Sequence, residues 1–120
     1  MERCDENEAK CTVITVQSLI GGKWKIGLIW FISQRTRRFN ELKKLLPGIT
    51  QKMLTMQLRE LEKDHIIHRE VYPVVPPRVE YSLTEIGRKL LPVFGQMQQW
   101  GEEYLEYREK IDISNCRSNS

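Results

Sequence analysis

The segment PGITQKMLTMQLRELEKD, residues 47 to 64, constrains the fold of this chain more than any other. Pro47 and Gly48 interrupt regular structure, and Thr50 is suited to cap a helix that begins at Gln51. Three residues at helical spacing form one apolar stripe on that helix: Leu54, Leu58 and Leu61. The opposite side carries cations and hydrogen-bonding groups without a carboxylate: Lys52, Thr55, Met56, Arg59 and Lys63. Such a face suits a polyanion.

Two interpretations of this basic face are open at this point. A basic face on an amphipathic helix is ordinarily a solvated surface. The preceding segment favours a second interpretation, because residues 39 to 46 form another short amphipathic stretch, joined to the helix only by residues 47 to 50. Two short helices around a tight turn that contains glycine predict a helix-turn-helix, whose second helix can enter the major groove of DNA.

The distribution of charge supports the second interpretation. The 120-residue chain has a formal net charge of only +3. Residues 35 to 63 nevertheless carry eight Lys or Arg against three Glu, a net +5, whereas residues 84 to 112 carry four basic against six acidic side chains, a net −2. Positive charge is therefore concentrated on the predicted helix-turn-helix, as nucleic-acid binding requires.

A change of periodicity follows the basic helix. Residues 67 to 72 and 78 to 83 are strand-like, and PVVPP at residues 73 to 77 makes a stiff connection, so a two-stranded hairpin, or wing, is predicted. We expect the groove of duplex DNA to be faced by Gln51, Lys52, Thr55, Met56 and Arg59, next to the capping Thr50. The candidate phosphate contacts are Lys23, Lys25, Arg38 and Lys43, with Arg78 at the wing.

The two ends of the chain predict self-association. A weak helix over residues 11 to 20 precedes two glycines, and a last helix is expected from Thr84 to about Lys110, bent at Pro92. Its apolar stripe is longer than one small domain can cover, so a second copy should bury it. The expected interface comprises Val13, Val16, Phe94, Met97, Trp100 and Tyr104. Residues 1 to 10 are predicted to be a flexible arm, residues 11 to 111 the domain, and residues 112 to 120 a disordered tail.

Composition and motifs exclude several classes. No apolar run approaches the length of about 20 residues that spans a bilayer, and no secretory segment follows the charged start, so a cytoplasmic protein without a membrane partner is expected. The three cysteines are too few and too scattered for a disulfide framework. We find no phosphate loop and no nucleophile elbow. His65 and His68 have no cysteine nearby in sequence, so we expect no metal site. Without these motifs we also expect that the protein has no cofactor and is not an enzyme.

Cys11 has two interpretations. A free cysteine is usually a buried, inert thiol. Cys11 is also predicted at the start of a helix, where the helix dipole lowers the pKa of a thiol, and a polar arm precedes it. A redox-sensing thiol is therefore the second interpretation.

Taken together, these motifs resemble an HxlR-type transcriptional regulator, a bacterial winged-helix family related to MarR-type regulators. The resemblance rests on Cys11, IGGKW at 20 to 24, RFNEL at 38 to 42, PGITQKMLTMQLRELE at 47 to 62, HREVYP at 68 to 73 and VEYSLTEIG at 79 to 87. It implies a winged helix, a homodimer built from the terminal helices, and palindromic operator DNA. Some members sense oxidants or electrophiles through this cysteine, although Thr12 stands where many members have proline.

We therefore expect an α+β winged helix-turn-helix homodimer that binds double-stranded DNA and regulates transcription. An oxidant or a small molecule is the expected class of effector, with repression and activation both open. Two rival classes are weighed against this function. A winged-helix scaffold for protein interactions would not need the local +5, and a small enzyme would need chemistry that the motifs lack.

Overall fold

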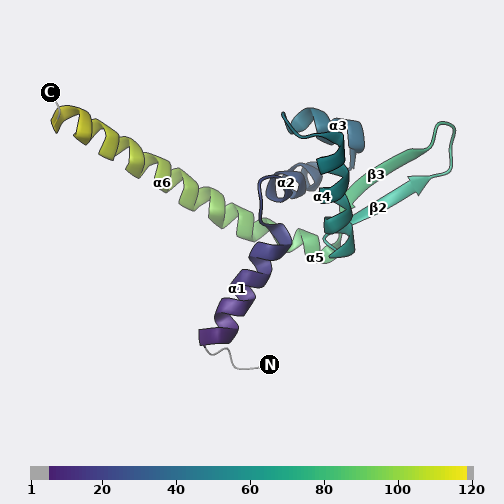
Figure 1. Ribbon diagram of the computed structural model, residues 1–120, viewed down its shortest axis with the longest axis horizontal. Helices are drawn as coiled ribbons and strands as arrows, with labels where there is room; N and C mark the ends of the chain where they lie inside the picture. The colour runs from purple at the N-terminus through teal and green to yellow at the C-terminus, as the bar shows by residue number, and fades with distance from the viewer. Residues whose placement is uncertain (1–5, 119–120) are drawn as a thin grey trace. The chain divides into compact units, whose positions relative to one another are not determined.

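The computed structural model describes the backbone of residues 6–118 and the side chains of residues 12–113. The chain divides into two compact units, Met1–Arg88 and Lys89–Ser120 (Figure 1). The first unit contains α1 (Glu6–Ile20), α2 (Lys25–Gln34), β1 (Arg37–Arg38), α3 (Phe39–Leu45), α4 (Gln51–Lys63), β2 (Ile67–Tyr72), β3 (Arg78–Leu83) and α5 (Glu85–Arg88). The second unit is formed by α6 (Leu91–Ser118).

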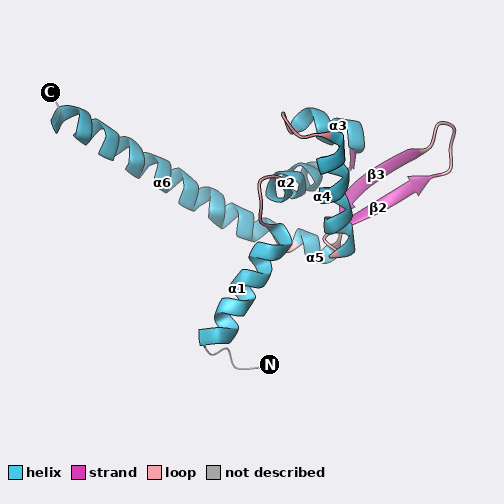
Figure 2. Cartoon of the chain, viewed as in Figure 1, coloured by secondary structure: helices cyan, strands magenta, loops and turns pink. Residues whose placement is uncertain are grey.

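The antiparallel sheet has the strand order β1-β3-β2. Figure 2 shows β2 and β3 as the long hairpin of this sheet. The two strands of the wing, β2 and β3, begin and end at the predicted residues, so that prediction is confirmed. The third strand, β1, was not predicted. It has only two residues, which pair with Tyr81 and Glu80 of β3, and two residues cannot display an alternating pattern.

The core of the first unit lies between α2, α3, α4 and the sheet. The leucine stripe of α4 is buried as predicted, with Leu54, Leu58 and Leu61 at most 2% exposed. α2 is apolar on most sides and contributes Leu28 and Ile29, which are fully buried. Because α4 buries one face in this core and packs against β2, its opposite face is held in a fixed orientation toward solvent.

Two threonine hydroxyls set the helix starts that position the site. Thr50 caps α4, its hydroxyl oxygen accepting the Met53 N–H at 3.0 Å, as the sequence predicted. Thr84 caps α5 in the same way, accepting the Gly87 N–H at 3.0 Å. The Thr84 hydroxyl also donates to the carbonyl of His65 at 2.6 Å, which fixes α5 to the segment that follows α4.

The helix predicted from Thr84 to about Lys110 is not continuous. It is split into α5 and α6, with a turn at residues 89 and 90, and Pro92 lies in the first turn of α6 instead of bending its middle. Backbone N–H groups in the first turn of a helix have no partner within that helix, so a proline, which has no N–H, is tolerated there. In the middle of a helix a proline would break a hydrogen bond, which explains why the break precedes Pro92.

Both terminal helices are longer than the sequence predicted. α1 begins at Glu6, so Cys11 lies in its second turn and not at its start. α6 continues to Ser118, past the predicted boundary at residue 111, because no glycine or proline follows Gly101. Residues 1–5 of the predicted arm and residues 119–120 of the predicted tail lie outside the described residues.

Within the described part of the chain, no helix combines the length and the apolar character needed to cross a membrane. The same residues contain no group of three His, Cys, Asp or Glu side chains that could hold a metal ion.

Candidate nucleic-acid interface

The outward face of α4 brings together the residues predicted to face DNA. Gln51, Lys52, Met56 and Arg59 are exposed, and Thr55 is half-buried. Thr55 donates its hydroxyl to the carbonyl of Gln51 at 2.8 Å, one turn earlier in the same helix. These five side chains and Glu60 line one open, shallow surface, which we call the α4 face.

Lys25 lies elsewhere than predicted. Its side chain is only 9% exposed, and its Nζ lies 2.6 Å from Oε2 of Glu60. The buried ammonium group is directed at Glu60 and not at solvent, so this geometry does not favour the expected phosphate contact. The ion pair between Lys25 and Glu60 has another effect. It neutralises the carboxylate that lines the α4 face, so the positive charges of Lys52 and Arg59 have no opposing charge there.

Three other predicted phosphate contacts remain accessible. Lys43 is exposed on α3, and Lys23 is exposed with its Nζ 4.8 Å from the centre of the Trp24 ring. Arg38 is exposed at the start of α3, with its Nε 3.9 Å from Glu80. At these distances and exposures the contacts hold the side chains weakly, so the charges remain available to a phosphate.

Glu41 limits the positive charge near α3. Its carboxylate accepts the backbone N–H of Arg38 at 3.0 Å and pairs with Arg35 at 2.5 Å. The hydrogen bond from Arg38, followed by the positive charge of Arg35, lowers the pKa of Glu41 below its ordinary value. Glu41 is therefore ionised at neutral pH, and Arg35 is the cation that it compensates.

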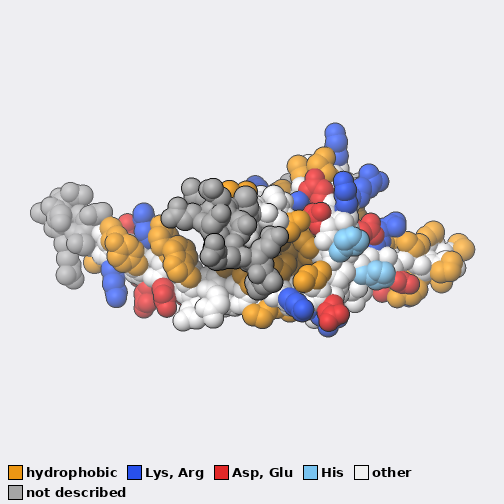
Figure 3. All heavy atoms as spheres, turned by 90° about the horizontal axis from the view of Figure 1, so that it is seen from below, with side chains coloured by type: hydrophobic (Ala, Val, Ile, Leu, Met, Phe, Trp, Pro, Cys, Tyr) orange, Lys and Arg blue, Asp and Glu red, His pale blue; other side chains and the backbone are white. Residues whose placement is uncertain are grey.

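Arg78, the predicted wing contact, is held within the wing. Its guanidinium lies 4.4 Å from the centre of the Tyr72 ring, and its Nε lies 3.3 Å from Glu80. The tip beyond it is apolar, and Val75 is fully exposed there (Figure 3). Arg78 therefore sits at the base of an uncharged tip.

The predicted interface residues of the terminal helices are mostly exposed in the single chain. Val13 and Val16 of α1 are exposed, as are Met97, Trp100 and Tyr104 of α6. The rings of Trp100 and Tyr104 stack with their centres 5.3 Å apart. Phe94 differs, because it is only 5% exposed before any partner binds. The side chain of Cys11 lies outside the described residues, so only its place in α1 is given.

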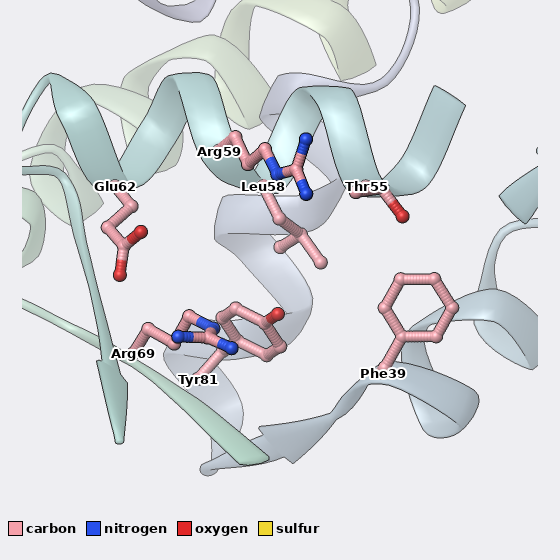
Figure 4. Close-up of a pocket in the computed structure, with 7 residues that line it drawn as sticks. All are labelled: Phe39, Thr55, Leu58, Arg59, Glu62, Arg69 and Tyr81. Atoms are coloured by element: carbon pink, nitrogen blue, oxygen red, sulfur yellow. The ribbon is translucent and has the colours of Figure 1, made fainter. Parts of the chain in front are cut away.

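A cavity that the sequence did not predict lies between α4 and the wing (Figure 4). This α4–wing cavity has a volume of about 310 Å³ and is lined by Phe39 of α3, Thr55, Leu58, Arg59 and Glu62 of α4, Arg69 of β2 and Tyr81 of β3. Arg69 and Tyr81 occur in ordinary strand positions. Only their directly opposed pairing in the sheet places both beside α4, and sequence alternation does not reveal that pairing.

A helix-turn-helix followed by an antiparallel hairpin against its second helix defines the winged-helix class, with the chemistry of the α4 face on its outer side. The model of the HxlR-like helix-turn-helix family matches residues 19–109, and the chain belongs to that family.

Similar proteins include the HTH-type transcriptional regulator YdeP of Bacillus subtilis, which is 56% identical over 87% of this chain and 81% of its own length. Two solved structures of the redox regulator HypR are also similar. The oxidised form is 56% identical with a TM-score of 0.73, over 78% of this chain and 96% of that chain. The reduced form is 52% identical with a TM-score of 0.78, over 82% and 98%.

Proposed function

We propose that this chain is a transcriptional regulator that binds duplex DNA as a homodimer, with α4 in the major groove. The observation that carries the proposal is the α4 face, where Lys52 and Arg59 project from a helix whose other side is fixed in the core. The face is cationic because Lys25 compensates Glu60. A helix presented in this way has the size and charge to enter a major groove.

Binding to random duplex DNA should weaken steeply with salt. Each phosphate contact releases counterions, so the logarithm of the affinity falls by about 0.9 per neutralised phosphate for each unit of log salt concentration. Lys52→Gln removes one exposed cation of the α4 face and should reduce this slope by about 1. Fluorescence anisotropy of a labelled duplex, titrated at several salt concentrations, measures the slope.

Lys89→Gln is the matched control, because Lys89 is an exposed cation that does not line the α4 face. Its slope should equal that of the wild type. An affinity that does not change with salt, or an equal slope change in both variants, contradicts the placement of DNA on α4.

We also propose that Cys11 senses oxidants. The support is its position in α1, a helix whose exposed Val13 and Val16 are proposed interface residues, together with similarity to a redox regulator. A bulky or charged group on Cys11 would change the packing of α1 against a partner. That change would move the two α4 helices away from successive major grooves, which are about 34 Å apart.

Diamide should abolish binding of the wild type to an operator selected from a random duplex pool, and a reductant should restore it. Cys11→Ser should keep its binding after the same treatment. The double variant Cys4→Ser, Cys116→Ser keeps Cys11 and should lose binding like the wild type, unless one of those thiols is the disulfide partner. Equal loss in the wild type and in Cys11→Ser would remove the sensing role from Cys11.

A further inference from the structure

We infer that Glu60 is a base-reading residue that selects cytosine in the major groove, and that the buried Lys25 is the residue that positions it. The inference rests on the proposed function, because it needs α4 in the groove of duplex DNA. It adds one determinant of sequence specificity to that function. Three observations carry it: the place of Glu60 on the α4 face, its contact with Lys25, and the hydrogen-bonding chemistry of a carboxylate.

Glu60 belongs to the row of side chains that the α4 face presents. Lys52, Met56 and Glu60 follow one another at intervals of four residues, so they form one row along the helix. The side chain of Glu60 is 45% exposed, and it lines the same open surface as Gln51 and Arg59. A major groove that receives this surface therefore receives the Glu60 carboxylate as well.

The contact with Lys25 comes from the buried side of Glu60. The Lys25 side chain is 9% exposed, and its Nζ lies 2.6 Å from Oε2 of Glu60. A buried ammonium group needs a partner, and Glu60 is the only ion-pair partner of Lys25 among the residues that the structure describes. Lys25 begins α2, which also carries the buried Leu28 and Ile29, so a rigid part of the core holds the carboxylate in place.

The ion pair makes a carboxylate compatible with a DNA groove. A free carboxylate there is repelled by the phosphates, whereas this one is offset by the ammonium, so the pair adds no net charge to the α4 face. A carboxylate has two oxygens with about four acceptor sites in total, and the Lys25 ammonium does not use all of them. The exposed part of the group can therefore still accept a hydrogen bond from a base.

The chemistry of the carboxylate selects the base. A carboxylate accepts hydrogen bonds and cannot donate them. In the major groove guanine presents only acceptors, and thymine presents an acceptor and a methyl group. Adenine has a donor at N6, but its acceptor N7 lies beside that donor and repels an oxygen. Cytosine presents its N4 donor without a neighbouring acceptor on the same base, so cytosine is the base that Glu60 selects.

Selection of operators from a random duplex pool tests the inference. The full-length wild type should recover cytosine at one position, favoured by about tenfold over the other bases. Glu60→Gln keeps the length of the side chain and an oxygen for the Lys25 ammonium, but its amide also donates. It should therefore lose the cytosine preference and gain adenine at that position. Recovery of the same bases by the wild type and by Glu60→Gln at every position overturns the inference.

Glu62→Gln is the matched control. It makes the same chemical change on the same helix, but Glu62 does not line the α4 face, and Figure 4 shows its side chain directed from α4 toward the strands. This variant should recover the same sites as the wild type. If it lost the same preference as Glu60→Gln, the effect would come from the charge of α4 in general, and base reading by Glu60 would be refuted.

A modified base tests the contact at a single atom. N4-methylcytosine still pairs with guanine, but its methyl group replaces the N4 hydrogen that faces the major groove. At the selected position it should weaken binding of the wild type about tenfold, and binding of Glu60→Ala less than about twofold. Equal effects on the two proteins overturn the inference, because the N4 hydrogen would then have no contact with Glu60.

Variants of Lys25 test the positioning role. Lys25→Met keeps the apolar stem and leaves Glu60 without its cation, so binding to random duplex DNA should weaken about tenfold and the cytosine preference should fall. The double variant Lys25→Met, Glu60→Gln should bind random duplex within about twofold of the wild type and still not select cytosine. Lys25→Arg keeps a cation and should keep the preference. If Lys25→Met selected cytosine like the wild type, the pair would serve stability alone and Lys25 would not position Glu60.

The same measurements separate this inference from the proposed function. A protein whose binding to random duplex falls steeply with salt, but whose base preferences do not change in Glu60→Gln, retains the proposed function and refutes the reading of cytosine by Glu60. A protein that does not bind random duplex, or that binds it independently of salt, refutes the proposed function, and base reading by Glu60 with it.

Discussion

Trp100→Ala is expected to convert the protein from a dimer to a monomer at micromolar concentration. Trp100 is 65% exposed in the single chain, an unusual condition for the largest apolar side chain, and it stacks on Tyr104. If a second copy buries it fully, its loss costs about 3 to 5 kcal/mol of association free energy. That change raises the dimer dissociation constant by a factor on the order of 100 or more.

The spacing of exposed residues on α6 supports this expectation. Val93, Met97, Trp100, Tyr104 and Tyr107 follow one another at intervals of four, three, four and three residues, and all five are exposed. Such alternation is typical of a helix that packs along a partner helix. The opposite side of α6 carries Glu102, Glu106 and Glu109, so the helix has one apolar and one acidic side.

Sedimentation velocity of the wild type and the variant measures the effect. Glu106→Ala is the matched control, because it truncates an exposed side chain on the acidic side of the same helix and should leave the dimer intact. A wild-type protein that sediments as a monomer at micromolar concentration contradicts the proposed dimer. A Trp100→Ala protein as dimeric as Glu106→Ala would show that the interface lies elsewhere.

The sequence predicted the elements whose local pattern is strong. The leucines of α4 recur at a helical period, and the wing strands are bounded by Asp64 on one side and by the PVVPP segment between them. Thr50 was identified as a cap because a hydroxyl before a helical pattern has a specific local partner, the N–H of Met53. In each case the residues that determine the element lie within a few positions of one another in the sequence.

Features that depend on distant residues were not predictable in this way. Lys25 and Glu60 pair across α2 and α4, and neither position differs locally from a solvated charge. The Tyr81 hydroxyl and Arg69 reach one cavity only because β2 and β3 pair in a particular register. The ends of the terminal helices, at Glu6 and Ser118, were also not predicted. The polar sequences there are compatible with a helix but contain no signal that specifies where it ends.

Several roles meet on α4. Its leucines fill the core, its outer side forms the α4 face, and Thr55 and Arg59 also line the α4–wing cavity. The orientation of α4 relative to the wing therefore determines the geometry of both the α4 face and the cavity. The contact between Ile66 and α5 holds the base of the wing, where β2 begins and β3 ends. A small change at this contact should disturb both the α4 face and the cavity.

Gly87→Ala is expected to unfold this connection. A Cβ atom at Gly87 would lie 2.2 Å from the carbonyl oxygen of Ile66, a distance that atoms cannot adopt, and Ile66 directly precedes β2. Since the clash is with backbone, no side-chain rotation relieves it, and α5 must move away from β2. The Thr84 hydroxyl would then lose the hydrogen bonds that it donates to the carbonyls of His65 and Ile66. We expect a loss of about 3 kcal/mol in the free energy of unfolding.

Thermal and urea denaturation measure this loss, and a melting temperature lower by on the order of 10 °C is expected for Gly87→Ala. Gly95→Ala makes the same chemical change on α6, where a Cβ atom would meet no atom within 4 Å. Alanine is the better helix former, so that variant should be unchanged or more stable by up to about 1 kcal/mol. The opposite signs isolate the close approach from the general effect of adding a methyl group to a helix. Equal melting temperatures for the two variants would mean that α5 is not packed on Ile66 in solution, and that some other contact orients the wing against α4.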